Sequence, residues 1–312
     1  MSNDAHICTL FEGDYHYGLG AFLNSLVNAG FSGTVWIGYR GNIPEWVNKY
    51  KTETSRDTFL IEKNIKLVFI RQENPVHFTF QKPDFMLSIW NNYCPDAECM
   101  YYFDPDILLK TNWSFFERWA SHGIALCEDV GSPFSKTHPI RLEWVDYFSK
   151  KGTTLVPKDN YYINAGFIGL RKSYKSFLAD WKYIQSLIQE DITEQNLIGV
   201  KDRSYCFHMP DQDALNIAKD RTAHPLSIAD KNAMDFISGG YIMSHAIGTP
   251  KPWKKNFLKH LLQTGNRPST ADRLYFKFTR NPIDLYANNR FKYFFSLINL
   301  KTAIFLGRLI GA

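Results

Sequence analysis

An α/β fold built on a mostly parallel sheet is the fold class that the 312-residue sequence predicts. Short β-rich runs alternate with stretches of helical periodicity through the first half of the chain. Alternation of this kind forms βαβ units, whose parallel strands bind ligands at their carboxyl ends. In agreement with this, the apolar run MYYF at 100–103 is followed directly by two aspartates, Asp104 and Asp106.

The predicted strands are short apolar runs, and the predicted helices are longer periodic segments bounded by Gly or Pro. One helix ends on a glycine cap at Gly30, and another begins around Pro83. The strands are expected at 6–11, 34–39, 65–70, 99–104, 123–129 and 163–170, with a closing apolar run at 236–248. The helices are expected at 17–30, 43–51, 80–93, 113–121, 173–189 and 211–220. Residues 131–160 are polar and are predicted as a loop, with a helix around 141–149.

Charge is distributed unevenly along the chain, although the formal net charge is only +5. From Lys251 to the end there are 12 Lys or Arg residues and two acids, so a mildly acidic body precedes a basic tail. Such a tail is expected to bind an anionic partner. No nucleic-acid recognition motif is present, so nucleic acid is not the expected partner.

A cytoplasmic location is the expectation from three features of the sequence. Five cysteines form no CxxC pair, which is typical of reduced thiols. The start, MSNDAHICTLF, has no basic segment followed by an apolar one, and no run of about 18 apolar residues occurs. The abundance of aromatics (24 Phe, 17 Tyr and 8 Trp) suits both sugar stacking and membrane interfaces, so by itself it decides nothing.

The first candidate motif is Asp104–Pro105–Asp106. No Gly-rich phosphate loop follows the first strand, since HICTLFEGDYHYGLG matches neither common pattern. A divalent metal held by carboxylates is the usual substitute for such a loop. Residues two apart at a strand end point the same way, and Pro105 fixes the turn between them. An ordinary turn is the alternative interpretation, and the motif alone does not decide between the two.

Three further motifs add polar groups to this picture. SHAIGTPKPW (244–253) offers an imidazole in His245, close backbone approach at Gly248 and a cation in Lys251. MPDQDALN (209–216) places Asp211 and Gln212 at a helix start, where a capping role is the simpler explanation. YINAGFIGL (162–170) carries Asn164 as its one polar side chain, for which a structural hydrogen bond would suffice.

Together FDPDI, INAGF, PDQDALN and SHAIGTPKPW resemble, in order and spacing, the family-8 retaining glycosyltransferases. That family includes bacterial lipopolysaccharide galactosyl- and glucosyltransferases and glycogenin. The resemblance covers roughly residues 6–255, and the His-x-x-Gly-x-x-Lys-Pro-Trp signature with Asp-Gln-Asp is its specific part. It implies a GT-A fold and a UDP-sugar donor bound through Mn²⁺, with Mg²⁺ as the alternative ion.

The resemblance also implies roles for individual residues. Asp104, Asp106 and His245 match the metal ligands, and Gly248 with Lys251 matches the diphosphate cradle. The uracil and ribose side is assigned to Leu10, Phe11 and Tyr17, and Lys82 matches a basic residue near the donor phosphates. The donor sugar is assigned to Asp129, Asn164, Asp211 and Gln212. Retention normally uses a carboxylate nucleophile, but Gln212 is a poor one. A front-face reaction is therefore favoured, with a covalent intermediate on Asp211 left open.

Two domains and an acceptor class complete the expectation. Residues 1–255 are assigned as the transferase domain and residues 256–312 as a basic, amphipathic tail. In that tail Leu297, Leu300, Ile304 and Ile310 are expected to form an apolar face that lies on an anionic membrane, near a lipid-linked saccharide acceptor. A C-terminal helix docked on the body is the alternative. The rival functions are a non-catalytic sugar- or membrane-binding protein and a sugar-nucleotide pyrophosphorylase.

Overall fold

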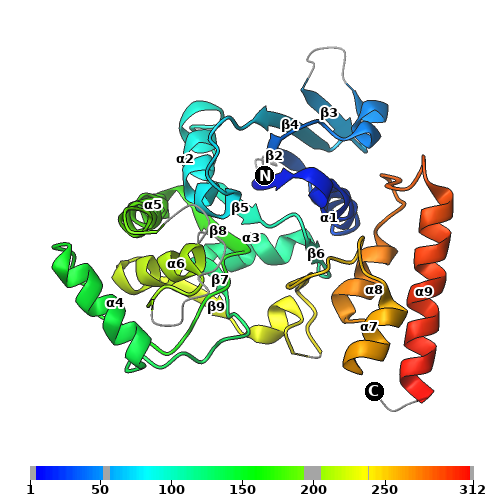
Figure 1. The fold of residues 1–312 in the computed structure, drawn as a ribbon. Helices are drawn as coiled ribbons and strands as arrows, with labels where there is room; N and C mark the ends of the chain where they lie inside the picture. Colours follow the sequence, from blue (N-terminus) through cyan, green and yellow to red (C-terminus); the bar gives the residue numbers. More distant parts are fainter. Residues whose placement is uncertain (1–4, 52–56, 193–204, 238, 310–312) are drawn as a thin grey trace.

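The computed structural model describes residues 5–51, 57–192, 205–237 and 239–309. Over these ranges an eight-stranded sheet has the order β3-β4-β2-β1-β5-β8-β7-β9 (Figure 1). Its strands are β1 (Ala5–Glu12), β2 (Gly33–Arg40), β3 (Thr58–Ile61), β4 (Ile65–Arg71), β5 (Cys99–Phe103), β7 (Ile124–Cys127), β8 (Phe167–Arg171) and β9 (Leu226–Ala229). A separate ribbon pairs β6 (Ile107–Leu109) with β10 (Met243–His245).

The sheet is mostly parallel, as the alternating pattern predicts. Strands β4, β2, β1 and β5 pair in parallel, while β8 is antiparallel to both β5 and β7. Because β8 runs the other way, the residues just before it meet the carboxyl ends of β5 and β7 at one edge of the sheet. The strand expected at 163–170 also begins later than predicted. It starts at Phe167, and Ile163 makes only an isolated bridge to Glu128.

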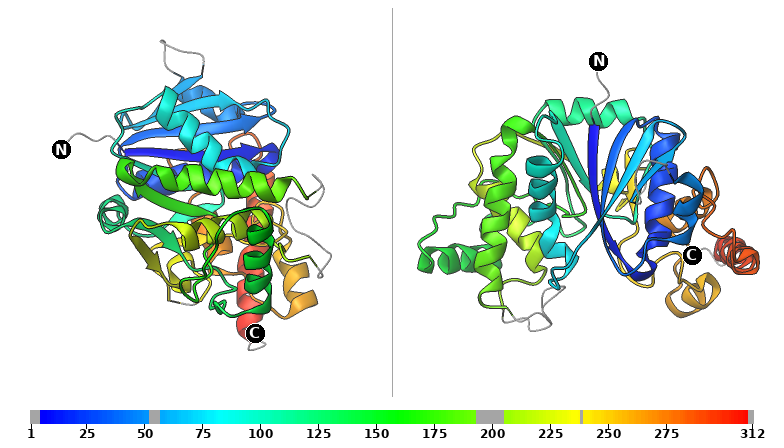
Figure 2. Two further views of the ribbon diagram at one scale, coloured as in Figure 1. Left: turned by 90° about the vertical axis from the view of Figure 1, so that its left-hand side faces the viewer. Right: turned by 90° about the horizontal axis from the view of Figure 1, so that it is seen from above.

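Helices cover both faces of the sheet, and side chains alternate between the two cores. On β5, Tyr101 and Phe103 enter one core, while Met100 and Tyr102 enter the other. The first core packs α1 (His16–Asn28) and α3 (Trp113–Ser121), and the second packs α2 (Lys82–Asn92), α4 (Pro139–Lys150), α5 (Ser176–Gln189) and α6 (Pro210–Arg221). Figure 2 shows α5 and α6 on the opposite side of the sheet from α1.

Several local predictions need correction. The helix expected at 43–51 is a short 3-10 helix, η2 (Glu45–Tyr50), and another 3-10 turn, η1 (Gly13–Tyr15), precedes α1. The hydrophobic pattern does not predict the short strands β3, β6 and β9, because three or four residues show too little periodicity. The helix expected around 141–149 is present as α4.

Between residues 257 and 309, three helices pack on the sheet domain: α7 (Phe257–Thr264), α8 (Thr270–Lys277) and α9 (Arg290–Leu309). Tyr275 and Ile283 belong to the same core as α1. The buried Asn24 side chain on α1 bonds the backbone of Phe278 and Ile283, at 2.7 and 2.8 Å. The segment therefore shares its core with the body.

Helix α9 packs on the protein through the face that the sequence analysis expected to lie on a membrane. Leu300 is buried, and Leu297 and Ile304 pack partly against the core, so the expected membrane face is the docked face. Ile310 lies outside the described residues. Within the described ranges, none of the helices has the length and apolar character needed to cross a membrane.

Candidate active site

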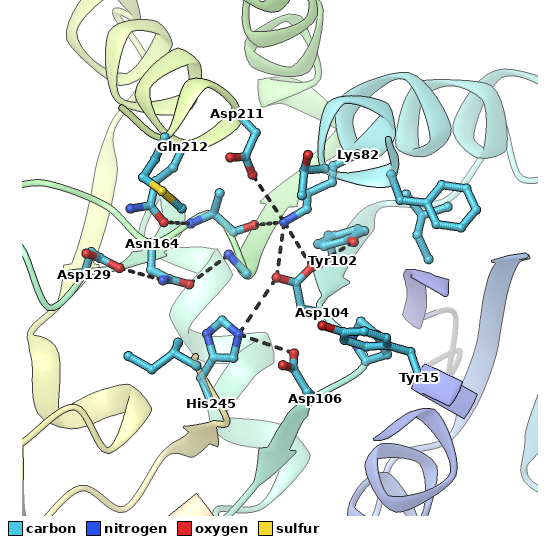
Figure 3. A pocket seen from close by; sticks show the side chains of 18 of the residues that line it. Tyr15, Lys82, Tyr102, Asp104, Asp106, Asp129, Asn164, Asp211, Gln212 and His245 are labelled. Carbon is cyan, nitrogen blue, oxygen red and sulfur yellow. Dashed lines mark hydrogen bonds and ion pairs between the residues drawn. The ribbon is translucent and has the colours of Figure 1, made fainter. Parts of the chain in front are cut away.

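Two carboxylates and an imidazole meet at the edge where β5 ends. The chain leaves β5 at Phe103, turns through Asp104, Pro105 and Asp106, and enters β6. Pairing of β6 with β10 sets His245 opposite Ile107. The ligand-type atoms of Asp104, Asp106 and His245 consequently lie within 4.8 Å of one another (Figure 3).

The three groups suit a divalent cation. His245 Nε2 lies 3.4 Å from a carboxylate oxygen of Asp106 and 3.9 Å from one of Asp104. Two carboxylates with one imidazole form a mixed oxygen and nitrogen donor set, which Mn²⁺ accepts well. Gly166 makes room for this approach, because a Cβ there would lie 2.7 Å from His245 Cε1 and 3.1 Å from Asp104 Oδ2.

Lys251 places a cation beside this cluster. Its Nζ lies 2.6 Å from Asp106 Oδ2 and donates to the carbonyl oxygen of Ala246 at 2.7 Å. Burial alone would raise the pKa of Asp106, but His245 and Lys251 together hold that pKa below its ordinary value. Asp106 is 5% exposed, so it is a buried carboxylate that stays ionised.

Lys82 links the metal-type cluster to the start of α6. Its buried Nζ donates to the carbonyl oxygen of Ala165 at 2.9 Å and lies 3.0 Å from Asp104. The same nitrogen lies 4.0 Å from Asp211 Oδ2. Burial raises the pKa of Asp211 to about 6, with Lys82 opposing the shift and Asp104 adding to it. Protonation of Asp211 therefore responds to pH close to neutrality.

The segment before β8 is built by side-chain hydrogen bonds from neighbouring elements. Asn164 donates to Asp129 at 2.7 Å and accepts from the backbone N–H of Gly166 at 2.9 Å. Gln212 accepts from the N–H of Ala165 at 3.1 Å. A structural hydrogen bond was the simpler explanation of Asn164 in the sequence analysis, and such bonds are present. They also hold the Asn164 side chain at the cavity wall (Figure 3).

These groups line one cavity of about 500 Å³, a volume in the usual range for small-ligand sites. Of the residues singled out from the sequence, the cavity brings together Leu10, Phe11, Lys82, Asp104, Asp106, Asp129, Asn164, Asp211, Gln212, His245, Gly248 and Lys251. Tyr17 lies elsewhere: it stacks on Tyr286, with ring centroids 5.3 Å apart, and lines a second cavity.

The cavity also contains residues that sequence reasoning missed. Tyr15 occupies the wall where Tyr17 was expected, and Lys251 Nζ lies 5.7 Å from its ring centroid. Tyr102 donates to Asp104 at 3.0 Å, and Glu12 and His77 lie at the wall. Tyr102 could have been found from its position two residues before Asp104, on the same side of β5. Nothing in the local sequence marks His77.

Asp213, one turn into α6, gives a testable pH dependence. It is buried, accepts from Tyr162 at 2.5 Å and from the N–H of Met209 at 2.9 Å, and burial raises its pKa from 3.8 to about 7. Between these values the folded state binds a proton that the unfolded chain has lost, so stability falls as pH rises through this window.

We expect Asp213→Asn to flatten that decline, measured as the melting temperature between pH values of about 5 and 8. Asp211 contributes in the same direction, so part of the slope should remain. The slope is compared rather than the absolute stability, because asparagine alters the bond to Met209. Asp146→Asn, on the exposed side of α4, is the control. An unchanged slope in Asp213→Asn would contradict the assignment.

The mostly parallel sheet flanked by helices, with its cavity at the strand ends, is a GT-A glycosyltransferase fold. Among solved structures, the chain is similar to the apo structure of WbbM, a bifunctional glycosyltransferase, with a TM-score of 0.54 and 12% identity. The match covers 94% of this chain and 52% of the WbbM chain, so the chain spans about half the length of that protein. No protein-family model matches the chain, and no curated protein matches it by sequence.

Proposed function

We propose that the protein is a metal-dependent retaining glycosyltransferase of the family-8 type, which moves a hexose from a UDP-sugar to a saccharide acceptor. The observation that carries this proposal is the meeting of Asp104, Asp106 and His245 within 4.8 Å, in a cavity that Lys251 also lines. The GT-A fold adds support at the level of architecture. Galactose, glucose and N-acetylglucosamine are the candidate donor sugars.

Each charged group has a part in holding the donor. Asp104, Asp106 and His245 would hold Mn²⁺ or Mg²⁺, which when bound neutralises charge on the diphosphate. Lys251, partly buried beside Asp106, supplies a fixed cation for the same phosphates. Gly248 has a φ of +77°, a conformation that favours glycine and exposes its backbone at the cavity wall. Leu10, Phe11 and Tyr15 offer apolar surface to the base and ribose.

The reacting sugar would lie against the start of α6. Gln212 is held by its bond to Ala165, and Asp211 lies 4.0 Å from Lys82. An amide is a weak nucleophile, so we favour a front-face reaction in which the leaving phosphate accepts the proton of the acceptor hydroxyl. Gln212 and Asp211 then orient the sugar and stabilise positive charge that develops on its ring. Asn164 and Asp129, bonded to each other, form the neighbouring wall.

Calorimetric titration with UDP, with and without Mn²⁺, tests the proposal. We expect UDP to bind at least tenfold more tightly with the metal, and EDTA to abolish hydrolysis of the preferred UDP-sugar. A screen of UDP-hexoses identifies the donor, and proton NMR should show an α-linked product. Metal-independent UDP binding without turnover would favour the non-catalytic alternative. Release of pyrophosphate would favour a sugar-nucleotide pyrophosphorylase.

We also propose that the C-terminal segment, residues 256–312, attaches the protein to the cytoplasmic face of a membrane. The outer face of α9 is apolar and exposed. It consists of Phe291, Phe294, Phe295, Ile298, Phe305, Leu306 and Leu309. Lys292, Lys301 and Arg308 are exposed on the same helix. Apolar and basic side chains together suit an anionic lipid surface. A lipid-linked acceptor in polysaccharide or lipopolysaccharide synthesis would then lie near the active site.

The triple variant Phe291→Ser, Phe295→Ser, Phe305→Ser tests this attachment, because these side chains are 80%, 65% and 61% exposed and do not support the core. We expect binding to phosphatidylglycerol vesicles to weaken by roughly 100-fold, since each ring contributes on the order of 1 kcal/mol. The exposed pair Val156→Ser, Tyr241→Ser serves as the control. Absence of binding of the wild-type protein to such vesicles at low salt would contradict membrane attachment.

A further inference from the structure

We propose that the second cavity is a binding site for a neutral saccharide, separate from the transfer site. It has a volume of about 590 Å³ and lies between η2, the start of α1 and the segment 284–289 that leads into α9. In Figure 1 this is the region between α1 and the upper end of α9. The turn η1 separates the two cavities: Glu12 and Tyr15 line the first, while Gly13 and Tyr17 line the second.

Three aromatic side chains give this cavity partly exposed ring surfaces. Trp46 donates its indole N–H to His16 at 3.4 Å, and Tyr50 donates to the carbonyl oxygen of Pro282 at 2.7 Å. Tyr17 is stacked on Tyr286. The polar ends of Trp46 and Tyr50 are thus occupied by the protein, and the rings are held in place. Fixed aromatic surface next to polar groups matches the apolar C–H face of a pyranose ring.

Amides and carboxylates supply the polar part of the lining. Asn42, Glu45, Asn288 and Asn289 all line the cavity, and the Asn288 amide donates to Glu45 at 3.2 Å across the gap between the two segments. The three asparagine amides both donate and accept hydrogen bonds, and the Glu45 carboxylate accepts them, as recognition of sugar hydroxyls requires. An apolar ligand would leave many of them unpaired, which is costly.

The charges of the lining do not favour an anion. Arg40 is engaged by Glu12 at 3.2 Å and by the carbonyl oxygen of Asn74, and Asp284 pairs with Arg290 at 2.8 Å. Arg40 and Lys49 are balanced by Glu45 and Asp284 within the lining. Burial lowers the pKa of His16, so its imidazole adds no charge at neutral pH. A phosphate or nucleotide would find no excess of cations here, so an uncharged polyhydroxyl ligand fits best.

Saturation-transfer NMR on the full chain tests the proposal with lactose, maltose, cellobiose and chitobiose as separate probes. At least one disaccharide should bind, and Trp46→Ala should weaken that binding about tenfold. Asn288→Ala, which changes an exposed side chain, should weaken it without affecting folding. Tyr93→Ala, at an exposed tyrosine outside both cavities, is the matched control and should bind as the wild type does.

The test is independent of the proposed transfer activity. Asp106→Asn, which alters only the first cavity, should leave disaccharide binding at the second unchanged. Binding that survives Trp46→Ala and Asn288→Ala but is lost in Asp106→Asn would place the sugar in the first cavity and overturn the proposal. Absence of binding by all four disaccharides would overturn it as well. Failure of UDP binding, by contrast, would contradict the proposed function alone.

Discussion

Asp106→Asn should lower turnover of the preferred UDP-sugar by at least about 100-fold and weaken Mn²⁺ binding. The substitution keeps the size of the side chain but removes the negative charge from one of the three ligand-type groups. It also leaves the Lys251 ammonium without the carboxylate that lies 2.6 Å away. Since Lys251 keeps its bond to the carbonyl oxygen of Ala246, we expect the fold to persist.

Asp235→Asn is the matched control for this substitution. Asp235 also forms a partly buried ion pair, with Lys110 at 2.7 Å, but neither residue lines the first cavity. Both variants remove a carboxylate from a partly buried pair with lysine, so a general effect of charge removal would appear in both. Asp106→Asn should lower turnover and weaken Mn²⁺ binding in a titration, whereas Asp235→Asn should change neither. A wild-type rate for Asp106→Asn, or full turnover of the wild type in excess EDTA, would exclude the metal assignment.

The largest loss of stability is expected from Asp220→Asn, which breaks a buried network between α4 and α6. Arg141 pairs with Asp220, and Lys219 lies 2.7 Å from both Asp220 and Asp159. The side chains of Arg141, Lys219 and Asp220 are no more than 1% exposed. Neutralising Asp220 leaves two buried cations with one partly exposed acid, and a buried charge that loses its partner costs about 3–5 kcal/mol.

Urea unfolding followed by circular dichroism measures this effect. Asp180→Asn is the control, because Asp180 pairs with Arg221 at 3.1 Å but both side chains are about a quarter exposed. Exposed ion pairs contribute about 0–1 kcal/mol to stability, so the urea midpoint of Asp180→Asn should differ little from that of the wild type. Similar midpoints for the two variants would show that the buried network does not stabilise the packing of α4 on α6. The double variant Arg141→Met, Asp220→Leu should recover part of the loss, since it removes a charge pair together.

Much of the candidate site was predictable because its residues follow buried strands or begin a helix. An apolar run identifies β5 by its sequence, and Asp104 and Asp106 follow at its end. The Pro-Asp-Gln-Asp start of α6 and the β10 histidine were recognisable as motifs. Tyr15 could not be distinguished from Tyr17, because η1 turns the backbone just before α1 and decides which side chain faces the cavity.

Periodicity alone does not decide which face of the C-terminal helix α9 is buried. Apolar residues surround much of α9, so its sequence offers two faces that could be buried. The structure buries Leu300 and Ala303 against the core and leaves Phe291, Phe295 and Phe305 exposed. The choice depends on the shape of the surface formed by α7 and α8, which no local pattern in α9 encodes.

By itself, the sequence determined the α/β class, the positions of the core strands and the chemical types of the residues at their ends. These features follow from local hydrophobic patterns and from the cost of burying unpaired polar groups. Tertiary structure alone decided the reversed direction of β8, the pairing that sets His245 beside Asp106, and the second cavity beside Trp46. Each of these depends on contacts between segments far apart in the chain, and their geometry is fixed only when the segments pack together.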